Sequence, residues 1–197
     1  GPHLVGIDLG TSAVKVVVVD EQGTVKATGT AEYPVLHPRI GWAEQDPDAW
    51  WQATVAAVQQ ALGWVGGSLD IRAVGFSGQM HGVTFLGEGE RSLYPAIIWA
   101  DQRATAQADF ISQQCGSDEV YRLTGNRVSA AYTAAKLLWT KDHQFDIYNR
   151  IYKVLQSKDY AAFLFTGVFA TDYSDASLTQ LLDINTRDWS TEILNPL

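Results

Sequence analysis

The alternation of apolar and polar residues predicts three strands at the start of the chain. Val5–Ile7 is a short apolar run, and Val14–Asp20 is rich in β-branched residues. After the polar turn Glu21–Gly23, the extended pattern continues over Val25–Tyr33. We expect the second and third strands to form a hairpin, so that the three strands make an antiparallel meander.

A helix start follows the meander. Asp46 is a good N-cap, Pro47 suits the first helical position, and Asp48 favours the positive end of the helix. Four apolar residues recur at spacings of four, three and four, which places them on one face of a helix: Trp51, Val55, Val58 and Leu62. We expect the helix to end at the glycines Gly63, Gly66 and Gly67.

Strands and helices alternate over the rest of the chain. The expected strands are Ile71–Phe76, which is apolar enough to be buried, Val83–Leu86, Ala96–Trp99, Tyr152–Leu155 and Leu181–Ile184. The expected helices are Gln102–Gln114 with Ala104, Ala108 and Ile111 on one side, Tyr132–His143, a helix capped by Ser157 that runs through Phe165 to Gly167, and a last helix capped by Ser190. A meander followed by this alternation predicts one α/β domain with a mixed sheet flanked by helices.

Composition and charge narrow the class of protein. The 197 residues are 46% hydrophobic and 18% charged, which favours a packed core. The net charge of −8, without a Lys/Arg cluster, disfavours nucleic acid and anionic membranes as partners. We expect no membrane span, no signal peptide and, with Cys115 as the single cysteine, a reducing cytoplasmic setting. Gly1–His3 resemble the remnant of a cleaved tag and are set outside the fold.

The turn between the first two strands is a candidate phosphate site. Gly10 lets the backbone approach an anion, while Thr11 and Ser12 offer N–H and hydroxyl donors. Asp8 ends the first strand, where it can face a divalent cation carried by the phosphate, and Lys15 can reach the same anion. The same residues also suit a turn without a ligand, with Asp8 as its cap and Lys15 as a solvated lysine.

A second group of candidates follows two later strands. Met80 and His81 lie in a glycine-flanked loop, where the imidazole can bind a hydroxyl and the thioether can pack an apolar surface. Trp99, Asp101 and Arg103 leave a strand end together. The indole can pack against a ligand, Asp101 can accept hydroxyl protons, and Arg103 can orient Asp101. Purely structural roles for His81, Trp99 and Arg103 remain open.

Six motifs stand in an order that resembles the FGGY family of sugar kinases: Gly6–Ser12, Trp42–Pro47, Ser77–Gly82, Pro95–Arg103, Leu123–Asn126 and Lys158–Tyr160. The resemblance implies an actin-like, ribonuclease-H-like ATPase fold. It also implies that residues 4–197 are the amino-terminal domain, which mainly holds the sugar. The family's general base, an Asp, and most of its nucleotide pocket belong to a carboxy-terminal domain that lies beyond residue 197.

The resemblance further implies a reaction and its cofactors. ATP and Mg²⁺ would be used to phosphorylate D-xylulose or a related small ketose or polyol. Asp8 would organise the metal as a catalytic residue, the turn and Lys15 would hold phosphate, and the second group would hold the sugar. The pair Met80–His81 resembles the D-xylulose branch, because glycerol kinases carry Arg-Glu there.

Some observations leave other functions open. Ala13 stands where the family usually has Gly, and Ala130–Lys136 departs from the usual Pro-Gly-Phe start of a loop near the sugar. Kinases for ribulose, gluconate or glycerol are therefore alternatives, as is a non-catalytic actin-like module that binds nucleotide or a partner protein. We assign Asp172 and Asp175 to loop structure and capping. We expect these 197 residues to fold alone without turning over sugar, with a hinge-facing surface exposed that favours homodimers.

Overall fold

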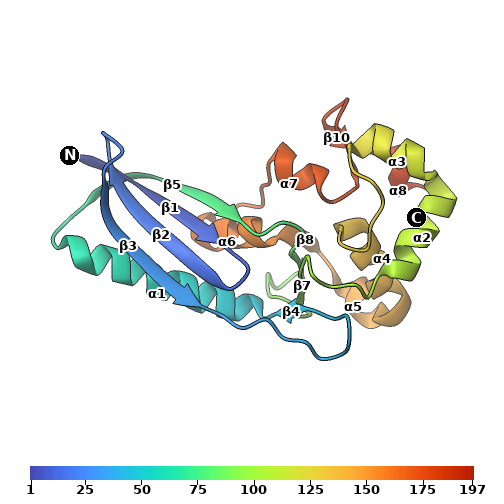
Figure 1. The fold of residues 1–197 in the computed structure, drawn as a ribbon, viewed down its shortest axis with the longest axis horizontal. Helices are drawn as coiled ribbons and strands as arrows, with labels where there is room; N and C mark the ends of the chain where they lie inside the picture. The colour runs from blue at the N-terminus through green and yellow to red at the C-terminus, as the bar shows by residue number, and fades with distance from the viewer.

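The computed structural model describes all 197 residues and contains two four-stranded sheets (Figure 1). The first sheet has the order β3-β2-β1-β5. Its strands are β1 (Pro2–Leu9), β2 (Ala13–Asp20), β3 (Val25–Glu32) and β5 (Asp70–Gly78). β1, β2 and β3 are antiparallel neighbours, which confirms the predicted meander, and β5 joins parallel to β1.

Two expectations about this sheet were wrong. β1 starts at Pro2, and His3 pairs with Asp20 on one side and Ile71 on the other, so these first residues belong to the fold. Their origin as a tag remnant stays a prediction. β5 is an exposed edge strand rather than a buried one. Its apolar residues gain cover on one side only, where Phe76 packs against Phe165 with the ring centres 5.5 Å apart.

Helix α1 (Pro47–Val65) packs on β2 and β3. The predicted start is confirmed, because the Asp46 side chain accepts a hydrogen bond from the Asp48 N–H. The apolar residues that the spacing placed on one face are not the most deeply buried ones. The residues that face the sheet are the small ones, Ala53, Ala57 and Ala61, whereas the larger apolar residues Trp51, Val55, Val58 and Leu62 are half-buried at the flanks.

A close approach of backbones explains this choice of face. A Cβ atom on Gly29 of β3 would lie only 1.9 Å from the carbonyl oxygen of Ala57. The helix therefore lies directly on the strand, and only small side chains fit between them. Helical spacing reveals that a helix has an apolar side, but the contact distance decides which stripe of that side is covered.

Helix α6 (Ser157–Thr166) covers β1 and β5 beside α1. The two helices enclose a core with the inward residues of the meander: Val5, Ile7, Leu9, Val14, Val16 and Val18. Ser157 is the first helical residue and not the predicted cap; Gln156 holds the cap position and the Ser157 hydroxyl donates to the Gln79 carbonyl. Gly167 ends the helix in a left-handed conformation, as predicted.

The second sheet is antiparallel and was not expected as a separate unit. Its order is β4-β7-β6-β8, with the strands β4 (Glu44–Gln45), β7 (Ala96–Ile97), β6 (Val83–Leu86) and β8 (Lys153–Gln156). The helices of this part are α2 (Thr105–Cys115), α3 (Ser117–Thr124), α4 (Thr133–His143) and α5 (Phe145–Arg150), of which α3 and α5 were not predicted. A second core lies here, and it includes Ala104, Ala108 and Ile111 as expected.

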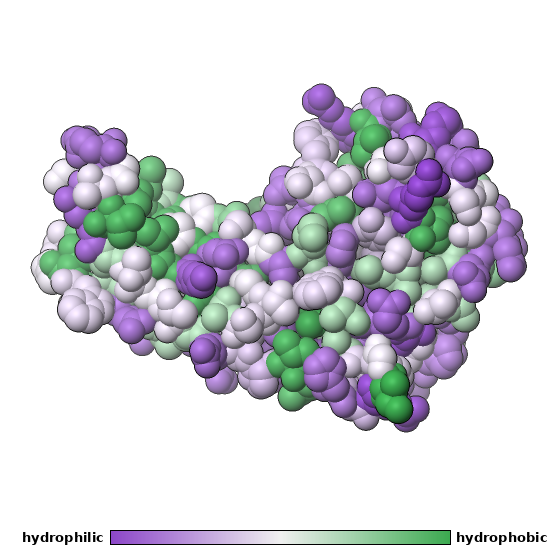
Figure 2. All heavy atoms as spheres, in the orientation of Figure 1, coloured by the Kyte–Doolittle hydropathy of each residue, from purple (hydrophilic) through white to green (hydrophobic).

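The chain ends in short elements: α7 (Tyr173–Ser177), β9 (Leu182–Asp183), β10 (Asp188–Trp189) and α8 (Thr191–Leu194). Asp172 caps α7 and Ser190 caps α8, which confirms both capping predictions. Figure 2 shows a broad hollow between the first sheet and the lobe that carries α3, α7 and β10. No helix combines the length and the apolar character that a membrane span requires.

Candidate functional site

Four polar residues form a row across the face of the first sheet that α1 and α6 leave open. Strand register places Ser77, Asp8, Lys15 and Thr30 next to one another on β5, β1, β2 and β3. All four are exposed, and the Ser77 hydroxyl donates to Asp8 Oδ1 over 2.9 Å. The structure thus brings together two residues predicted for phosphate and metal binding, Asp8 and Lys15.

The row borders a hollow of about 710 Å³ on the same sheet face. Gly6 and Gly75 are direct neighbours in the sheet and form part of its floor without side chains. A ligand can therefore approach the backbone of β1 and β5 beside the Asp8 carboxylate. Carboxylate oxygens and water are the ligands that Mg²⁺ prefers, so this face suits a hydrated cation that accompanies a phosphate.

The carbonyl groups of the Gly10–Ser12 turn accept hydrogen bonds from two buried side chains. The Tyr33 hydroxyl donates to the Gly10 carbonyl and the Gln45 amide donates to the Thr11 carbonyl, each over 2.5 Å. The N–H groups of Thr11 and Ser12 make no hydrogen bond within the chain. A turn whose carbonyls are engaged and whose N–H groups are free presents its positive side outward, as phosphate binding requires.

Gln45 connects this turn to the loop after β5. Its side chain is fully buried on β4. While its amide nitrogen donates to Thr11, its amide oxygen accepts from Trp50 Nε1 (3.0 Å) and Gln79 Nε2 (2.8 Å). A single buried side chain therefore joins the loop that carries Met80 and His81 to the Gly10–Ser12 turn, which we call the phosphate turn after its predicted role.

Met80 and His81 lie where this loop leaves the sheet. Met80 is 59% exposed and His81 is half-buried, with its ring perpendicular to the Tyr132 ring and the ring centres 4.6 Å apart. Burial, assisted by the charge of Lys136, lowers the pKa of His81 to about 4. The ring is therefore neutral near pH 7, and a neutral imidazole can both donate to and accept from hydroxyl groups.

Trp99 lies directly beside the phosphate turn. Its side chain is 47% exposed, which excludes a purely core role. Its indole N–H donates to the Thr11 hydroxyl over 3.1 Å. A residue predicted to contact substrate and one predicted to contact phosphate are thus in direct contact.

Asp101 and Arg103 differ from the prediction, because both side chains are enclosed. Asp101 accepts from the Ala43 N–H over 2.6 Å and forms a bidentate pair with Arg103 at 2.8–3.0 Å. Arg103 also pairs with Glu44 and stacks over Trp42 at 3.7 Å. Burial opposes its charge, but the two carboxylates raise the pKa of Arg103. Arg103 does orient Asp101, yet neither side chain faces an open surface, so direct contact with a ligand is not what the geometry provides.

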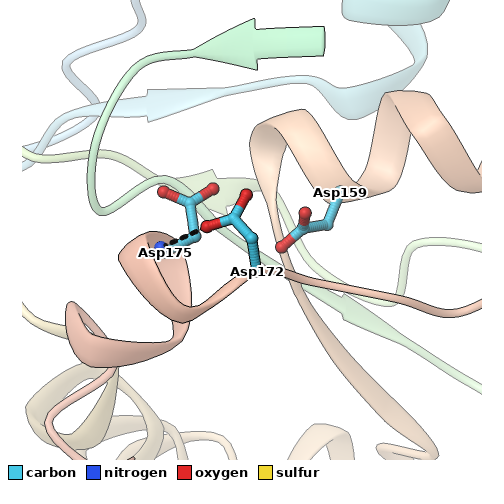
Figure 3. Close-up of side chains that lie close together, drawn as sticks. All are labelled: Asp159, Asp172 and Asp175. Carbon is cyan, nitrogen blue, oxygen red and sulfur yellow. Dashed lines mark hydrogen bonds between the residues drawn. The ribbon is translucent and has the colours of Figure 1, made fainter. Parts of the chain in front are cut away.

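The three carboxylates Asp159, Asp172 and Asp175 gather at the start of α6 and α7 (Figure 3). The Lys158 ammonium pairs with all three, at 2.9 Å from Asp159 and 3.2 Å from Asp175. Burial alone would lower the pKa of Lys158, but these ion pairs raise it. Asp172 also accepts from the Asp175 N–H, in agreement with the predicted capping role. The group is an ion-paired junction between two helices.

Sequence reasoning did not single out the buried polar residues that support the site: Tyr33, Gln45, Gln79 and Lys136. Two of them lie inside quoted motifs, since Gln45 belongs to Trp42–Pro47 and Gln79 to Ser77–Gly82. Lys136, within an otherwise apolar stretch of α4, was visible as a charge in a helix interior. Their partners are distant in sequence, so only the fold could reveal their roles.

Comparison with known proteins defines the class. The model of the FGGY family of carbohydrate kinases, N-terminal domain, matches residues 3–197. The chain therefore belongs to the FGGY family of carbohydrate kinases, as the motifs indicated. The solved structures that it resembles are sugar kinases, which confirms the predicted actin-like fold.

Individual relatives show which kinases of the family the chain is similar to. The chain is 45% identical to a xylulose kinase of Escherichia coli K12 over 96% of its own length and 39% of the relative's. Superposition on a xyloylose kinase from Brucella ovis gives a TM-score of 0.90 at 37% identity, over 98% of this chain and 40% of that one. Superposition on a gluconate kinase from Lactobacillus acidophilus gives a TM-score of 0.91 at 29% identity, over 98% of this chain and 39% of that one. The chain thus spans about two-fifths of these proteins, and its fold is shared by kinases with different substrates.

Proposed function

We propose that this chain is the sugar-holding domain of an ATP-dependent xylulokinase, which converts D-xylulose to D-xylulose 5-phosphate. The hydrogen bond between Trp99 and Thr11 is the observation that carries the proposal. It sets an exposed aromatic surface, suited to the carbon face of a sugar, against a turn suited to the phosphate being transferred. The names of several relatives that are 36–45% identical support D-xylulose as the sugar.

The proposed phosphate site consists of the Gly10–Ser12 turn and the row of polar residues on the open face of the first sheet. The free N–H groups of Thr11 and Ser12 would bind the γ-phosphate, and Lys15 would add positive charge. Asp8 would hold a water ligand of Mg²⁺, oriented by the Ser77 hydroxyl. When bound, the cation would neutralise the charge that develops on the transferred group. The residues present therefore fit the phosphate end of ATP and its Mg²⁺.

In the proposed sugar site, exposed side chains would contact the sugar and enclosed side chains would hold them in place. Met80 and Trp99 present apolar surface, and the neutral His81 presents a hydrogen-bonding ring. Asp101 and Arg103 would act behind this surface by fixing the chain after β7, from which Trp99 extends. We therefore propose a positioning role for this pair in place of direct contact.

A substrate panel tests the function. The complete kinase, meaning residues 1–197 joined to a carboxy-terminal domain such as the relatives carry, is assayed for ADP release with D-xylulose, D-ribulose, gluconate and glycerol. The highest kcat/KM is expected with D-xylulose. A higher value with another of these compounds would replace the substrate while keeping the kinase, whereas no turnover with any of them would favour a non-catalytic nucleotide-binding module.

The proposal includes a cytoplasmic location, where ATP is available and the single Cys115 remains reduced. Cell fractionation followed by immunoblotting tests this location. Homodimer formation stays a prediction, and sedimentation of the complete kinase measures it.

A further inference from the structure

Lys136 is a fully buried lysine whose amino group bonds both the loop after β5 and the end of β7. The side chain extends from α4, with none of its surface exposed. Its Nζ donates to the His81 carbonyl over 2.6 Å and to the Ile97 carbonyl over 3.3 Å. Burial lowers the pKa of Lys136 to about 7. A buried amino group is costly unless its donors are satisfied, so a lysine at this position points to a role of these two contacts in the fold or in the site.

The first contact holds a strained backbone. His81 adopts a φ of 61°, in the left-handed region that residues other than glycine seldom occupy. This conformation turns the loop after Met80. The next residue, Gly82, accepts a hydrogen bond from the Ser157 N–H, directly beside the pairing of Val83 with Gln156 in the second sheet. Local interactions do not favour the conformation, and the bond from Lys136 to the His81 carbonyl stabilises it from outside the loop.

The second contact holds the other side of the same region. Ile97 ends β7, and Trp99 follows it by two residues. His81 and Trp99 approach the site from different strands that are 18 positions apart in sequence, so no local rule sets the spacing between them. Lys136 bonds the backbone at the base of both segments and so links them directly.

We infer that Lys136 is a positioning residue for the sugar site, which fixes the His81 loop relative to the Trp99 segment so that the two side chains can hold the same sugar. This inference rests on the proposed function, because it takes His81 and Trp99 as the residues that contact the sugar. It predicts an effect on sugar binding that is larger than the effect on nucleotide binding, since neither contact of Lys136 involves the phosphate turn, which Trp99 contacts through its indole N–H.

The main test replaces Lys136 by methionine, which keeps the length and the apolar stem but removes the donors. In the complete kinase, Lys136→Met is expected to raise the KM for D-xylulose about tenfold or more, the effect of losing a hydrogen bond from a charged group. The KM for ATP should stay within about twofold of the wild-type value. Initial rates measured over both substrates provide the two constants.

A matched variant separates positioning from general loss of packing. Thr140 is also fully buried, lies one turn further along α4 and donates to the Lys136 carbonyl, but its side chain makes no hydrogen bond to the His81 loop or to Ile97. Thr140→Val should lower the melting temperature of the kinase and leave the KM for D-xylulose unchanged. An equal rise of this KM in both variants would mean that any disturbance of α4 has this effect, and it would overturn the inference.

A second readout does not depend on activity. The Lys136 charge contributes to the low pKa of His81, so its removal should raise the pKa of His81 from about 4, while burial keeps it below 6.5. Histidine-selective ¹³C NMR measures this pKa, with the His81 signal assigned by its absence in His81→Asn. An unchanged pKa in folded Lys136→Met would show that Lys136 does not lie against His81.

The two readouts distinguish the inference from the proposed function. If the wild-type kinase does not phosphorylate D-xylulose, the proposed function fails, and the NMR titration still tests the contact. If the kinase is active and Lys136→Met shifts the pKa but not the KM for D-xylulose, the positioning role is wrong. Should Lys136→Met not fold, Lys136→Gln keeps one shorter donor; it is expected to raise the same KM, and an unchanged KM would overturn the inference.

Discussion

The side-chain amide of Gln45 donates to the Thr11 carbonyl over 2.5 Å, and its oxygen accepts from Gln79. The phosphate turn and the His81 loop thus share one buried support, although 34 residues separate Gln45 from either partner. This relationship links the two halves of the proposed site, since a change at Gln45 reaches both.

Gln45→Ala should therefore affect stability and both substrates. It leaves the buried Trp50 and Gln79 donors without their acceptor, which should cost about 2–4 kcal/mol in the free energy of unfolding. We expect the KM values for ATP and for D-xylulose to rise together. Denaturant titration and two-substrate kinetics measure these effects, and a rise confined to one substrate would contradict the shared support.

Asp8→Asn should lower kcat far more than it weakens sugar binding. Asp8 lies near the end of β1, two residues before the Gly10–Ser12 turn, and loss of charge stabilisation at such a place commonly costs on the order of a hundredfold in rate. Steady-state kinetics at saturating Mg-ATP measure the change. Ser77→Ala, which removes only the hydroxyl bonded to Asp8, is the control and should have a much smaller effect. A kcat close to the wild-type value in Asp8→Asn would remove Asp8 from the mechanism.

His81→Ala should raise the KM for D-xylulose and leave the KM for ATP almost unchanged. The ring lies on the loop after β5, and one hydrogen bond to a neutral hydroxyl is worth about 0.5–1.5 kcal/mol. The resulting increase in KM is between about twofold and about tenfold. A rise in the KM for ATP, with the KM for D-xylulose unchanged, would show that the loop faces the nucleotide instead.

The low pKa of His81 predicts a pH dependence of stability. Because the folded-state pKa, about 4, lies below the ordinary value of 6.5, the folded chain binds fewer protons than the unfolded chain between these values. The contribution of His81 to stability is therefore complete above pH 6.5 and is lost as the pH falls toward 4. Urea titrations at several pH values should show a smaller loss for His81→Ala than for the wild type, and parallel curves would contradict the prediction.

The contact between α1 and β3 predicts a sharp difference between two glycines of one sheet. Gly29→Ala places a methyl group into the Ala57 carbonyl and should destabilise the fold by about 3 kcal/mol or more. Gly75→Ala meets no atom within 4 Å and should change the free energy of unfolding by less than about 1 kcal/mol. Thermal and urea unfolding of the two variants measure both values. Similar losses would mean that α1 does not lie directly on β3.

The sequence determined the elements whose signals are local. The meander, the Asp46 cap of α1, the helix over Thr133–His143 and the Gly167 stop depend on residues that are near one another in the chain, and the structure contains them all. The family also followed from the sequence, because six motifs in one order are a property of the chain itself.

Tertiary structure decided which surfaces are covered and which polar residues meet. The buried stripe of α1 depends on Gly29 in a different strand, and the exposure of β5 depends on its place at a sheet edge. Asp101 was predicted to face a sugar, but its oxygens are occupied by Ala43 and Arg103. Hydrophobic periodicity reports only that a residue prefers to be buried or exposed. The partner that satisfies a polar group comes from a distant segment, so the roles of Gln45 and Lys136 emerge only when the chain is folded.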